Sequence, residues 1–304
     1  NMGSAKEEKM KLSTTTLFYG PRPDGSVAPV MDSIRRIHKA GFRDVDLNFA
    51  WTRRRKTELY FDNWKDWIKQ CGELIEELGM TVSQSHAPFY NVIDSSYPYR
   101  EEEEEMVRRS IIAAAELGAE IVVIHGGSVP YCPDYKKNKM ENMEYFKPHL
   151  ELAAKYDVTI AIENLFDEND LQKRVRVSRY LADPEDLIDL VDSLHASYDN
   201  VGIVWDFGHA NLMNWNQPEC LEMIGKRLIA THVQDNYGVV DDHLLPYLGN
   251  VEWEPIMKTL KKIGYEGAFA YETHKMTDRL PDPMVDAMLR YAFELGNYLL
   301  SLAE

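Results

Sequence analysis

Histidines and carboxylates stand at the ends of six short runs of β-branched and aromatic residues. The six segments read SHAPF, VVIHGG, AIEN, WDFGH, THVQDN and AYETH, and the residues that could do chemistry in them are His86, His125, Glu163, Asp206, His209, His232 and Glu272. An ionisable side chain is costly inside a strand buried on both faces, so it is tolerated mainly at the strand's end. Histidine nitrogens and carboxylate oxygens bind divalent metals, so these ends would form a metal site wherever they meet.

The order of elements indicates how these ends would meet. Runs typical of strands cover 14–19, 43–49, 81–87, 121–126, 158–164, 201–207, 228–234 and 267–273. Amphipathic, helix-length segments lie near 28–40, 61–79, 100–117, 141–156, 184–197, 217–226, 253–263 and 283–302. Strict alternation of this kind predicts parallel strands with right-handed crossovers, and eight units predict a single (β/α)8 barrel. A doubly wound open sheet is the alternative, but it has its site at one switch point and would not explain ligand-type residues on so many strands.

Length and composition bound the remaining possibilities. A barrel of this type takes about 250 residues, so we assign 11–304 to one barrel domain. The polar segment 1–10 is excluded as disordered or introduced during cloning. The net charge of −16, from 34 basic and 50 acidic side chains, opposes nonspecific binding to nucleic acid.

The cysteines and the hydropathy of the chain indicate the cellular compartment. Cys71, Cys132 and Cys220 are far apart and show no paired spacing, which is typical of reduced thiols. The chain has neither an apolar run of about 18 residues nor the apolar core of a signal peptide. These features predict a cytoplasmic protein without a membrane partner.

Charge favours a metal among the carboxylates. Glu163, Asp206 and Glu272 would bring −3, and His232 is neutral as a ligand, so one divalent ion would leave the set near −1. Without a metal, three converging carboxylates would have raised pKa values and would partly protonate. A single strand-end histidine is more often a hydrogen-bonded core residue, and only the repetition of ligand types at successive strand ends indicates a metal.

A second group follows the seventh predicted strand. Asp241 and His243 are two residues apart in an extended loop, so their side chains share a face. Counting Asp241 brings the ligand charge to −4, which favours two or three metals. The alternative is that both residues bind substrate or brace the loop, and the sequence leaves the two interpretations open.

The motifs in this order, followed by D-x-H, GNVEW and a final YET, resemble the xylose-isomerase-like barrel superfamily over about residues 14–300. That superfamily includes sugar and sugar phosphate isomerases and epimerases, inosose dehydratases and nucleases of the endonuclease IV type. The ketose epimerase branch implies one Mn²⁺, Co²⁺ or Mg²⁺ on Glu163, Asp206, His232 and Glu272. It also implies that Glu163 and Glu272 act as acid and base, and that His209 binds substrate.

The endonuclease IV branch implies three zincs on nine ligands instead. All nine can be matched here, at His86, His125, Glu163, Asp206, His209, His232, Asp241, His243 and Glu272. The resemblance to that branch is broken at residues 247–250, which read YLGN where that branch carries a Gly-Glu-Gly sequence.

Basic and aromatic residues occupy the predicted loops on the same face. The cations are Arg53, Arg54, Arg55, Lys56, Lys136, Lys137, Lys139, Lys173, Arg174, Arg176 and Arg179. They could steer an anionic substrate, but pairing with nearby acids is the favoured interpretation. The aromatic residues suit either the C–H face of a sugar or a base, and they are Trp51, Phe89, Tyr90, Tyr131, Tyr135 and Trp215. Five glutamates at 101–105 fit the first turn of a helix, with Glu104 and Glu105 expected to face Arg108 and Arg109.

Together these patterns predict a metal-dependent sugar or sugar phosphate isomerase or epimerase. A proton next to a carbonyl would be removed through a metal-stabilised enediolate, with Glu163 and Glu272 moving it. His86 and His125 would contact substrate or bind a second metal. The cofactor is one divalent ion (Mn, Zn, Mg or Co), with two or three left open, and the partner is a small sugar or keto-polyol, not nucleic acid.

Three other functions and the assembly state stay open. A keto-polyol dehydratase would begin with the same proton abstraction, an endonuclease IV-like multi-zinc phosphodiesterase would use the larger ligand set, and a barrel without catalysis would only bind a sugar. The oligomeric state is not fixed by the sequence, and a homo-oligomer is among the states considered.

Overall fold

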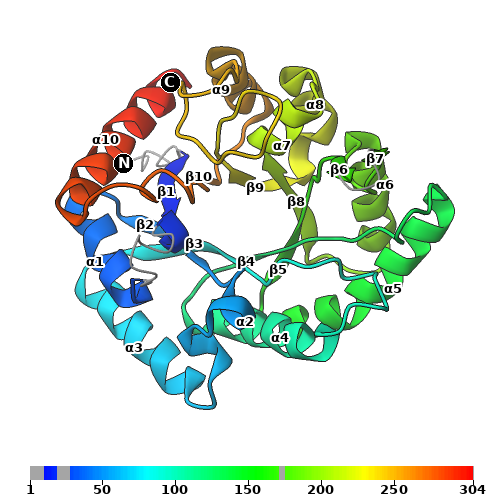
Figure 1. Ribbon diagram of the computed structural model, residues 1–304, viewed down its shortest axis with the longest axis horizontal. Coiled ribbons are helices and arrows are strands. Elements are labelled where there is room, and N and C mark those ends of the chain that lie inside the picture. Colours follow the sequence, from blue (N-terminus) through cyan, green and yellow to red (C-terminus); the bar gives the residue numbers. More distant parts are fainter. Residues whose placement is uncertain (1–9, 19–27, 171–174, 304) are drawn as a thin grey trace, which may run out of the picture.

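Eight parallel strands form the centre of the molecule, and helices surround them (Figure 1). The computed structural model describes residues 10–18, 28–170 and 175–303. The strands run around the sheet in the order β10 (Ala268–Tyr271), β1 (Lys11–Thr15), β2 (Asp44–Asn48), β3 (Thr81–His86), β4 (Ile121–Ile124), β5 (Thr159–Glu163), β8 (Val201–Asp206) and β9 (Leu228–His232). The ring closes between β9 and β10, where Val233 N donates to Ala270 O at 2.7 Å and Glu272 N to Val233 O at 3.0 Å. The predicted (β/α)8 barrel is confirmed.

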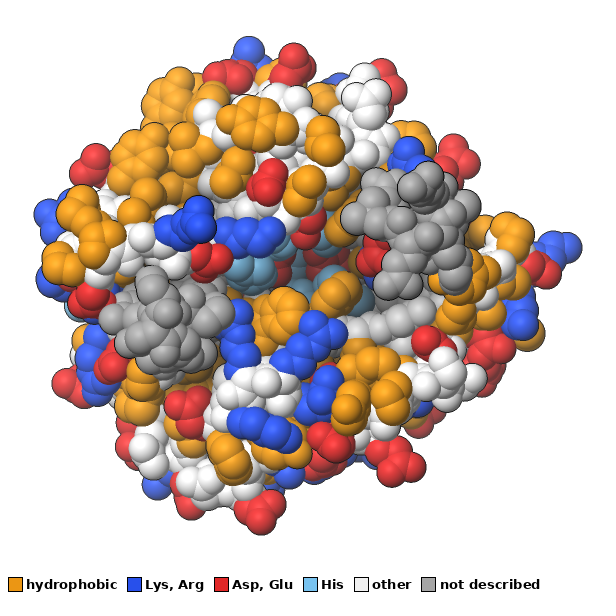
Figure 2. Space-filling view, in the orientation of Figure 1, with side chains coloured by type: hydrophobic (Ala, Val, Ile, Leu, Met, Phe, Trp, Pro, Cys, Tyr) orange, Lys and Arg blue, Asp and Glu red, His pale blue; other side chains and the backbone are white. Residues whose placement is uncertain are grey.

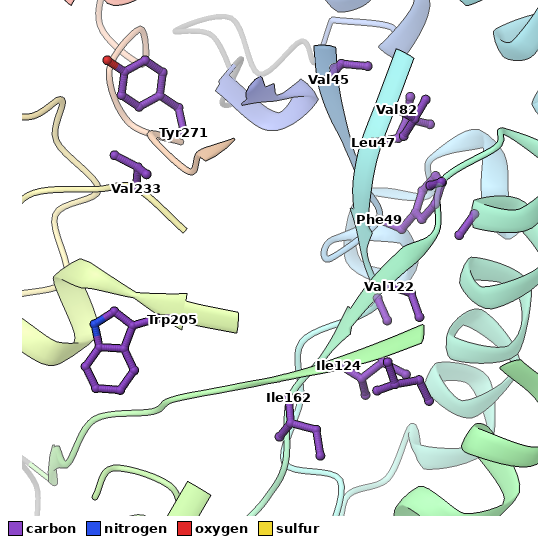
Figure 3. Close-up of a cluster of buried hydrophobic side chains, with 14 of the residues drawn as sticks. Val45, Leu47, Phe49, Val82, Val122, Ile124, Ile162, Trp205, Val233 and Tyr271 are labelled. Carbon is purple, nitrogen blue, oxygen red and sulfur yellow. The ribbon is translucent and has the colours of Figure 1, made fainter. Parts of the chain in front are cut away.

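Helices cover the outside of the barrel. They are α1 (Val30–Ala40), α2 (Thr52–Arg55), α3 (Trp64–Glu77), α4 (Arg100–Glu116), α5 (Tyr135–Ala154), α6 (Pro184–His195), α7 (Phe207–Leu212), α8 (Gln217–Ile224), α9 (Trp253–Ile263) and α10 (Asp282–Ser301). The main hydrophobic core lies between strands and helices, where outward-facing side chains such as Leu47, Ile162 and Trp205 are fully buried (Figure 3). Burial of this kind is the main stabilising term of the fold.

A small apolar layer fills part of the barrel's interior. It is formed by one inward residue from each of four neighbouring strands, Val123, Ala161, Val204 and Ala230. Side chains alternate along a strand, so the residue two positions further on faces the same way. Those four residues are His125, Glu163, Asp206 and His232. The apolar layer is therefore the floor beneath the ionisable cluster.

An irregularity in β3 turns His86 toward the interior. Val45 pairs with Val82, but the next pair is Asp46 with Gln84, so β3 holds one extra residue at this point. A one-residue bulge reverses which face the following side chains occupy. Gln84 and His86 consequently share the inward side with Asp46 and Asn48, their partners in the register.

Several elements differ from the sequence-based expectation, among them the short helices α2 and α7, which were not predicted. The first strand is Lys11–Thr15 and not 14–19, because Thr15 Oγ1 accepts from Leu17 N and the chain turns into a short 3₁₀ helix. Helix α5 begins six residues before the expected 141, because Asp134 caps it by accepting from Lys137 N at 3.1 Å. A two-stranded hairpin, β6 (Glu168–Asp170) and β7 (Val175–Val177), was not predicted. The excluded residues 1–9 lie outside the described part of the chain.

The three cysteines are free, and Cys71 and Cys220 are buried. Among the helices of the described residues, none has the length and hydropathy needed to cross a membrane.

Candidate active site

The carboxyl ends of the barrel strands surround a cavity of about 380 Å³. Figure 2 looks onto this face and shows histidine and acidic side chains at the bottom of a central hollow. The side chains that line it include seven of the predicted site residues, His86, His125, Glu163, His209, Asp241, His243 and Glu272. The other two, Asp206 and His232, are fully buried next to them. All nine are brought together, whereas the role of each stays a prediction.

Four of these residues have the geometry of a metal centre. One potential ligand atom from each of Glu163, Asp206, His232 and Glu272 lies within 4.8 Å of the others. His232 Nδ1 is 3.1 Å from Glu163 Oε1 and 3.5 Å from Glu272 Oε2. Asp206 Oδ2 is buried and has no hydrogen-bond partner among the described residues. Buried polar atoms are nearly always paired, so this set of donors fits a divalent cation.

Electrostatics within the cluster depend on how many histidines surround each carboxylate. Burial disfavours the charged form of Glu163, but His125 and His232 outweigh it and hold its pKa well below the usual value. The pKa of Glu272 is also held well below normal against burial, by His232 and His274. Asp206 has fewer such partners, and burial together with Glu163 and Glu272 raises its pKa to about 7 although His209 opposes this. The three carboxylates repel one another unless positive charge is added.

Three histidines around the cluster share one orientation. Each ring donates its Nδ1–H to a backbone carbonyl: His86 to Ala87 at 2.6 Å, His209 to Asn164 at 2.8 Å and His243 to Glu272 at 2.6 Å. A carbonyl acceptor fixes the tautomer, so in the neutral ring the lone pair is on Nε2. In His86 and His209 this nitrogen can accept a hydrogen bond from a substrate hydroxyl or bind a metal. His243 differs, because its Nε2 lies 2.8 Å from Asp241 Oδ2. Burial disfavours the charged ring, but Asp241 outweighs it and raises the pKa of His243 to about 10, so both ring nitrogens carry protons.

His125 is oriented differently from these three histidines. Its Nε2 is 2.6 Å from Glu163 Oε2 and 3.1 Å from His86 Nε2. His86, His125 and Glu163 form a further group with metal-ligand spacing.

Sequence reasoning missed two ionisable residues at the centre of the site, and also Lys275 and Asp278, which line the cavity. His274 Nε2 lies 3.3 Å from Glu272 Oε1, and the alternation rule could have found it, because it stands two residues after Glu272. Asp46 is fully buried in β2, and neither carboxylate oxygen has a hydrogen-bond partner among the described residues. Burial raises its pKa to about 7, opposed by His232 and His86. The alternating acids of DVDLN were the signal for a polar interior.

Three of the predicted cations near the mouth are paired with acids. Arg53 pairs with Glu103 at 2.6 Å, Arg176 with Asp167 at 2.9 Å and Arg179 with Glu168 at 2.9 Å. Lys136, Lys137 and Lys139 belong to the first turns of α5, so their expected position in a loop was wrong. Lys173 and Arg174 lie outside the described residues.

The aromatic residues divide into two groups. Trp51 and Phe89 line the cavity together with Phe166, which was not predicted. Tyr90 is buried and hydrogen-bonds to Glu104, and Trp215 donates to Ala182 O at 2.9 Å. Tyr131 and Tyr135 are exposed.

The glutamate run pairs differently from expectation. Glu105 binds both Arg108 and Arg109, at 2.7 and 2.9 Å, as a residue in the first turns of a helix does. Glu104 instead faces His149 at 3.1 Å, so its expected pairing with Arg108 was wrong.

Fold and cluster together define the class, a TIM barrel whose carboxyl-terminal face carries histidines and carboxylates able to hold a divalent ion. The chain belongs to the xylose isomerase-like TIM barrel family, whose model matches residues 34–292. The superfamily expected from the motifs is thereby confirmed.

Individual relatives share less than a third of their aligned residues with this chain. The uncharacterized protein y4fM of Sinorhizobium fredii is 29% identical over 70% of this chain and 83% of its own length. A D-psicose 3-epimerase of Enterocloster bolteae is 23% identical over 79% of this chain and 75% of its own. A solved D-tagatose 3-epimerase-like protein superposes with a TM-score of 0.75 at 24% identity, covering 97% of this chain and 98% of the other. At that identity the structural likeness shows the fold alone.

Proposed function

We propose that this protein is a divalent-metal-dependent sugar epimerase or isomerase that removes and returns a proton at a carbon next to a carbonyl group. The observation that carries the proposal is the meeting of Glu163 from β5 and Glu272 after β10 at one buried cluster with Asp206 and His232. The names of the epimerases with which the chain shares its family support a ketose as the substrate class.

Glu163, Asp206, His232 and Glu272 would hold the ion. When bound, it supplies positive charge beside the substrate's carbonyl and neighbouring hydroxyl oxygens, which lowers the cost of the enediolate. Asp206 Oδ2 would then gain the partner that the described protein residues do not provide.

Glu163 and Glu272 are suited to proton transfer because both are held ionised. Each also has a histidine beside it, His125 at 2.6 Å from Glu163 and His274 at 3.3 Å from Glu272. One glutamate would take the proton from one face of the substrate carbon, and the other would return a proton to the opposite face. Such a transfer inverts the configuration at that carbon.

The rest of the cavity suits one small hydroxylated molecule. His86 and His209 present ring nitrogens that can accept from hydroxyl groups. Phe89 and Phe166 lie against two of the histidines, with ring centroids 4.8 Å from His125 and 4.8 Å from His209. Aromatic faces of this kind contact the C–H groups of a sugar and exclude water from the reacting centre.

A multi-metal phosphodiesterase is the second candidate, and one observation favours it. Besides the four-residue cluster, His86, His125 and Glu163 have metal-ligand spacing, and so do His243, Glu272 and His274. Against it, the arginines near the mouth at 53, 176 and 179 are paired with acids, which leaves less positive charge for a polyanion. A keto-polyol dehydratase would begin with the same proton abstraction.

The test is conversion of ketoses by the purified protein. Incubation of D-psicose or D-tagatose with added Mn²⁺, Co²⁺, Mg²⁺ or Zn²⁺ should give a second ketose separable by chromatography, and a chelator should abolish its formation. Failure to convert any ketose or keto-polyol, together with three tightly bound zincs and cleavage of a phosphodiester, would replace the proposal with the nuclease.

A further inference from the structure

Arg55 and Asp278 face the cavity from its rim without forming an ion pair. Arg55 is the last residue of α2, which follows β2, and Asp278 lies in the segment between β10 and α10. Both line the cavity. Arg55 Nη1 and Asp278 Oδ1 are buried, and neither has a hydrogen-bond partner among the described residues.

Leaving such atoms unpaired is costly, and more so for charged groups than for neutral ones. Burial lowers the pKa of Arg55 while Asp278 opposes the change, and burial raises the pKa of Asp278 while Arg55 and Lys275 oppose it. The two side chains line the same cavity, yet they form no ion pair with each other.

Arg53, by comparison, forms a structural ion pair with Glu103. It lies two residues earlier in the same helix, and its Nε approaches Glu103 Oε1 at 2.6 Å with both side chains largely buried. The Arg55 guanidinium instead lies 5.6 Å from the Trp51 ring, and the residue lines the cavity.

The opposite charges of Arg55 and Asp278 indicate which chemical group could bind to both. An anion would bind Arg55 but be repelled by Asp278, and a cation would meet the reverse situation. A hydroxyl group satisfies both, because it accepts from the guanidinium and donates to the carboxylate. Of the other cations that line the cavity, Lys275 donates from Nζ to Asp241 O at 2.7 Å, and Arg179 pairs with Glu168.

We propose that Arg55 and Asp278 form a second subsite that binds a hydroxyl group at the end of the sugar remote from the reacting carbons. The proposal rests on the proposed function, because the reacting carbons are placed at the Glu163–Glu272 cluster. It narrows the substrate to a neutral polyhydroxylated chain and disfavours a terminal phosphate.

Calorimetric binding in the presence of Mn²⁺ tests this with D-psicose, its 6-deoxy analogue and D-psicose 6-phosphate. Hydrogen bonds to charged groups predict that the wild type binds D-psicose about tenfold or more tightly than the 6-deoxy analogue. Arg55→Met and Asp278→Asn should each weaken D-psicose binding by about that factor, leave the 6-deoxy analogue unchanged and so remove the preference.

Arg54→Met is the matched control. Arg54 neighbours Arg55 in α2 and lies over the same Trp51 ring at 4.9 Å, but it is exposed and does not line the cavity. This variant should keep the wild-type preference. Folding gives a second readout: Arg55→Met should unfold at the wild-type temperature or above it, whereas Arg53→Met should unfold below it.

Three results would overturn the subsite: equal binding of D-psicose by wild type and Arg55→Met, no binding of either neutral sugar, or tighter binding of the 6-phosphate that Arg55→Met abolishes. The last would make it an anion site. A wild type that shows the hydroxyl preference but converts no ketose would contradict the proposed function and still support the subsite.

Discussion

Asp206 Oδ1 accepts a hydrogen bond from the backbone N–H of His209 at 2.6 Å, so one carboxylate both ends strand β8 and caps helix α7. The cap uses Oδ1, while Oδ2 has no partner among the described residues, and Asp206 is one of the four residues of the metal-ligand cluster. The same contact fixes His209 beside Glu163, with its Nδ1 3.4 Å from Glu163 Oε1. The cap therefore leaves Oδ2 for the metal-binding role that we propose for this side chain.

Replacement of Asp206 should separate these two roles. Asparagine is as good a helix cap as aspartate, so Asp206→Asn keeps the cap, whereas Asp206→Ala loses it and should be less stable than Asp206→Asn by about 1 kcal/mol without metal. Both variants should lose most of the stabilisation by Mn²⁺, which at 100 times Kd is worth about 2.7 kcal/mol in the wild type. Urea unfolding with Mn²⁺ and with chelator measures this. Full Mn²⁺ stabilisation of Asp206→Asn would contradict the assignment of Oδ2 as a ligand.

A glycine in the loop that carries Asp241 and His243 gives a second prediction. Asp235 holds this loop by accepting from Tyr247 N, Val251 N and Trp253 Nε1 at 2.9 to 3.0 Å. A Cβ at Gly249 would overlap Asp235 Oδ1 and the backbone of Asn236. Gly249→Ala should therefore lower the free energy of unfolding by about 1–3 kcal/mol.

The control for this substitution is Gly72→Ala in the middle of α3. A Cβ there meets only Leu117, at 3.9 Å, and alanine is the better helix former. This variant should be more stable by about 0.5–1 kcal/mol, measured by the same urea titration. A Gly249→Ala protein as stable as wild type would show that the loop adjusts freely.

Nucleic acid should not bind. We expect no measurable affinity for a duplex containing an abasic site at about physiological salt, because the net charge is −16 and Arg53 and Arg176 are paired with acids. Fluorescence anisotropy across a salt series is the measurement. Specific cleavage of the duplex that disappears in Glu272→Gln would instead favour the nuclease.

The sequence predicts the barrel well because strand ends carry a strong signal: an ionisable residue such as Glu163 or His232 directly after an apolar run is unfavourable unless a buried strand ends there. It does not predict how strands are offset. The extra residue of β3 decides that His86 faces the interior, and a bulge between polar residues leaves no mark in the pattern. Asp46 was missed because a mid-strand acid is expected to be unfavourable, and this one is tolerated among histidines.

Loop geometry is the other part that the sequence leaves open. In the run of four basic residues at 53–56, Arg53 forms an ion pair, whereas Arg55 Nη1 has no partner among the described residues. The difference depends on which acids lie across the barrel mouth. Lys137 was expected in a loop because the cap formed by Asp134, several residues before the first strong amphipathic pattern, was not recognised.

Proton transfer by Glu163 and Glu272 is tested most directly by the exchange of solvent deuterium into a ketose, followed by NMR in deuterium oxide with Mn²⁺ present. We predict deuterium at the carbon next to the carbonyl in the wild type, none after chelation, and none in Glu163→Gln or Glu272→Gln. Asp242→Asn, which changes a carboxylate that does not line the cavity, should exchange as the wild type does. Undiminished exchange in either glutamine variant, or exchange that is unaffected by the chelator, would contradict metal-dependent proton transfer by this pair.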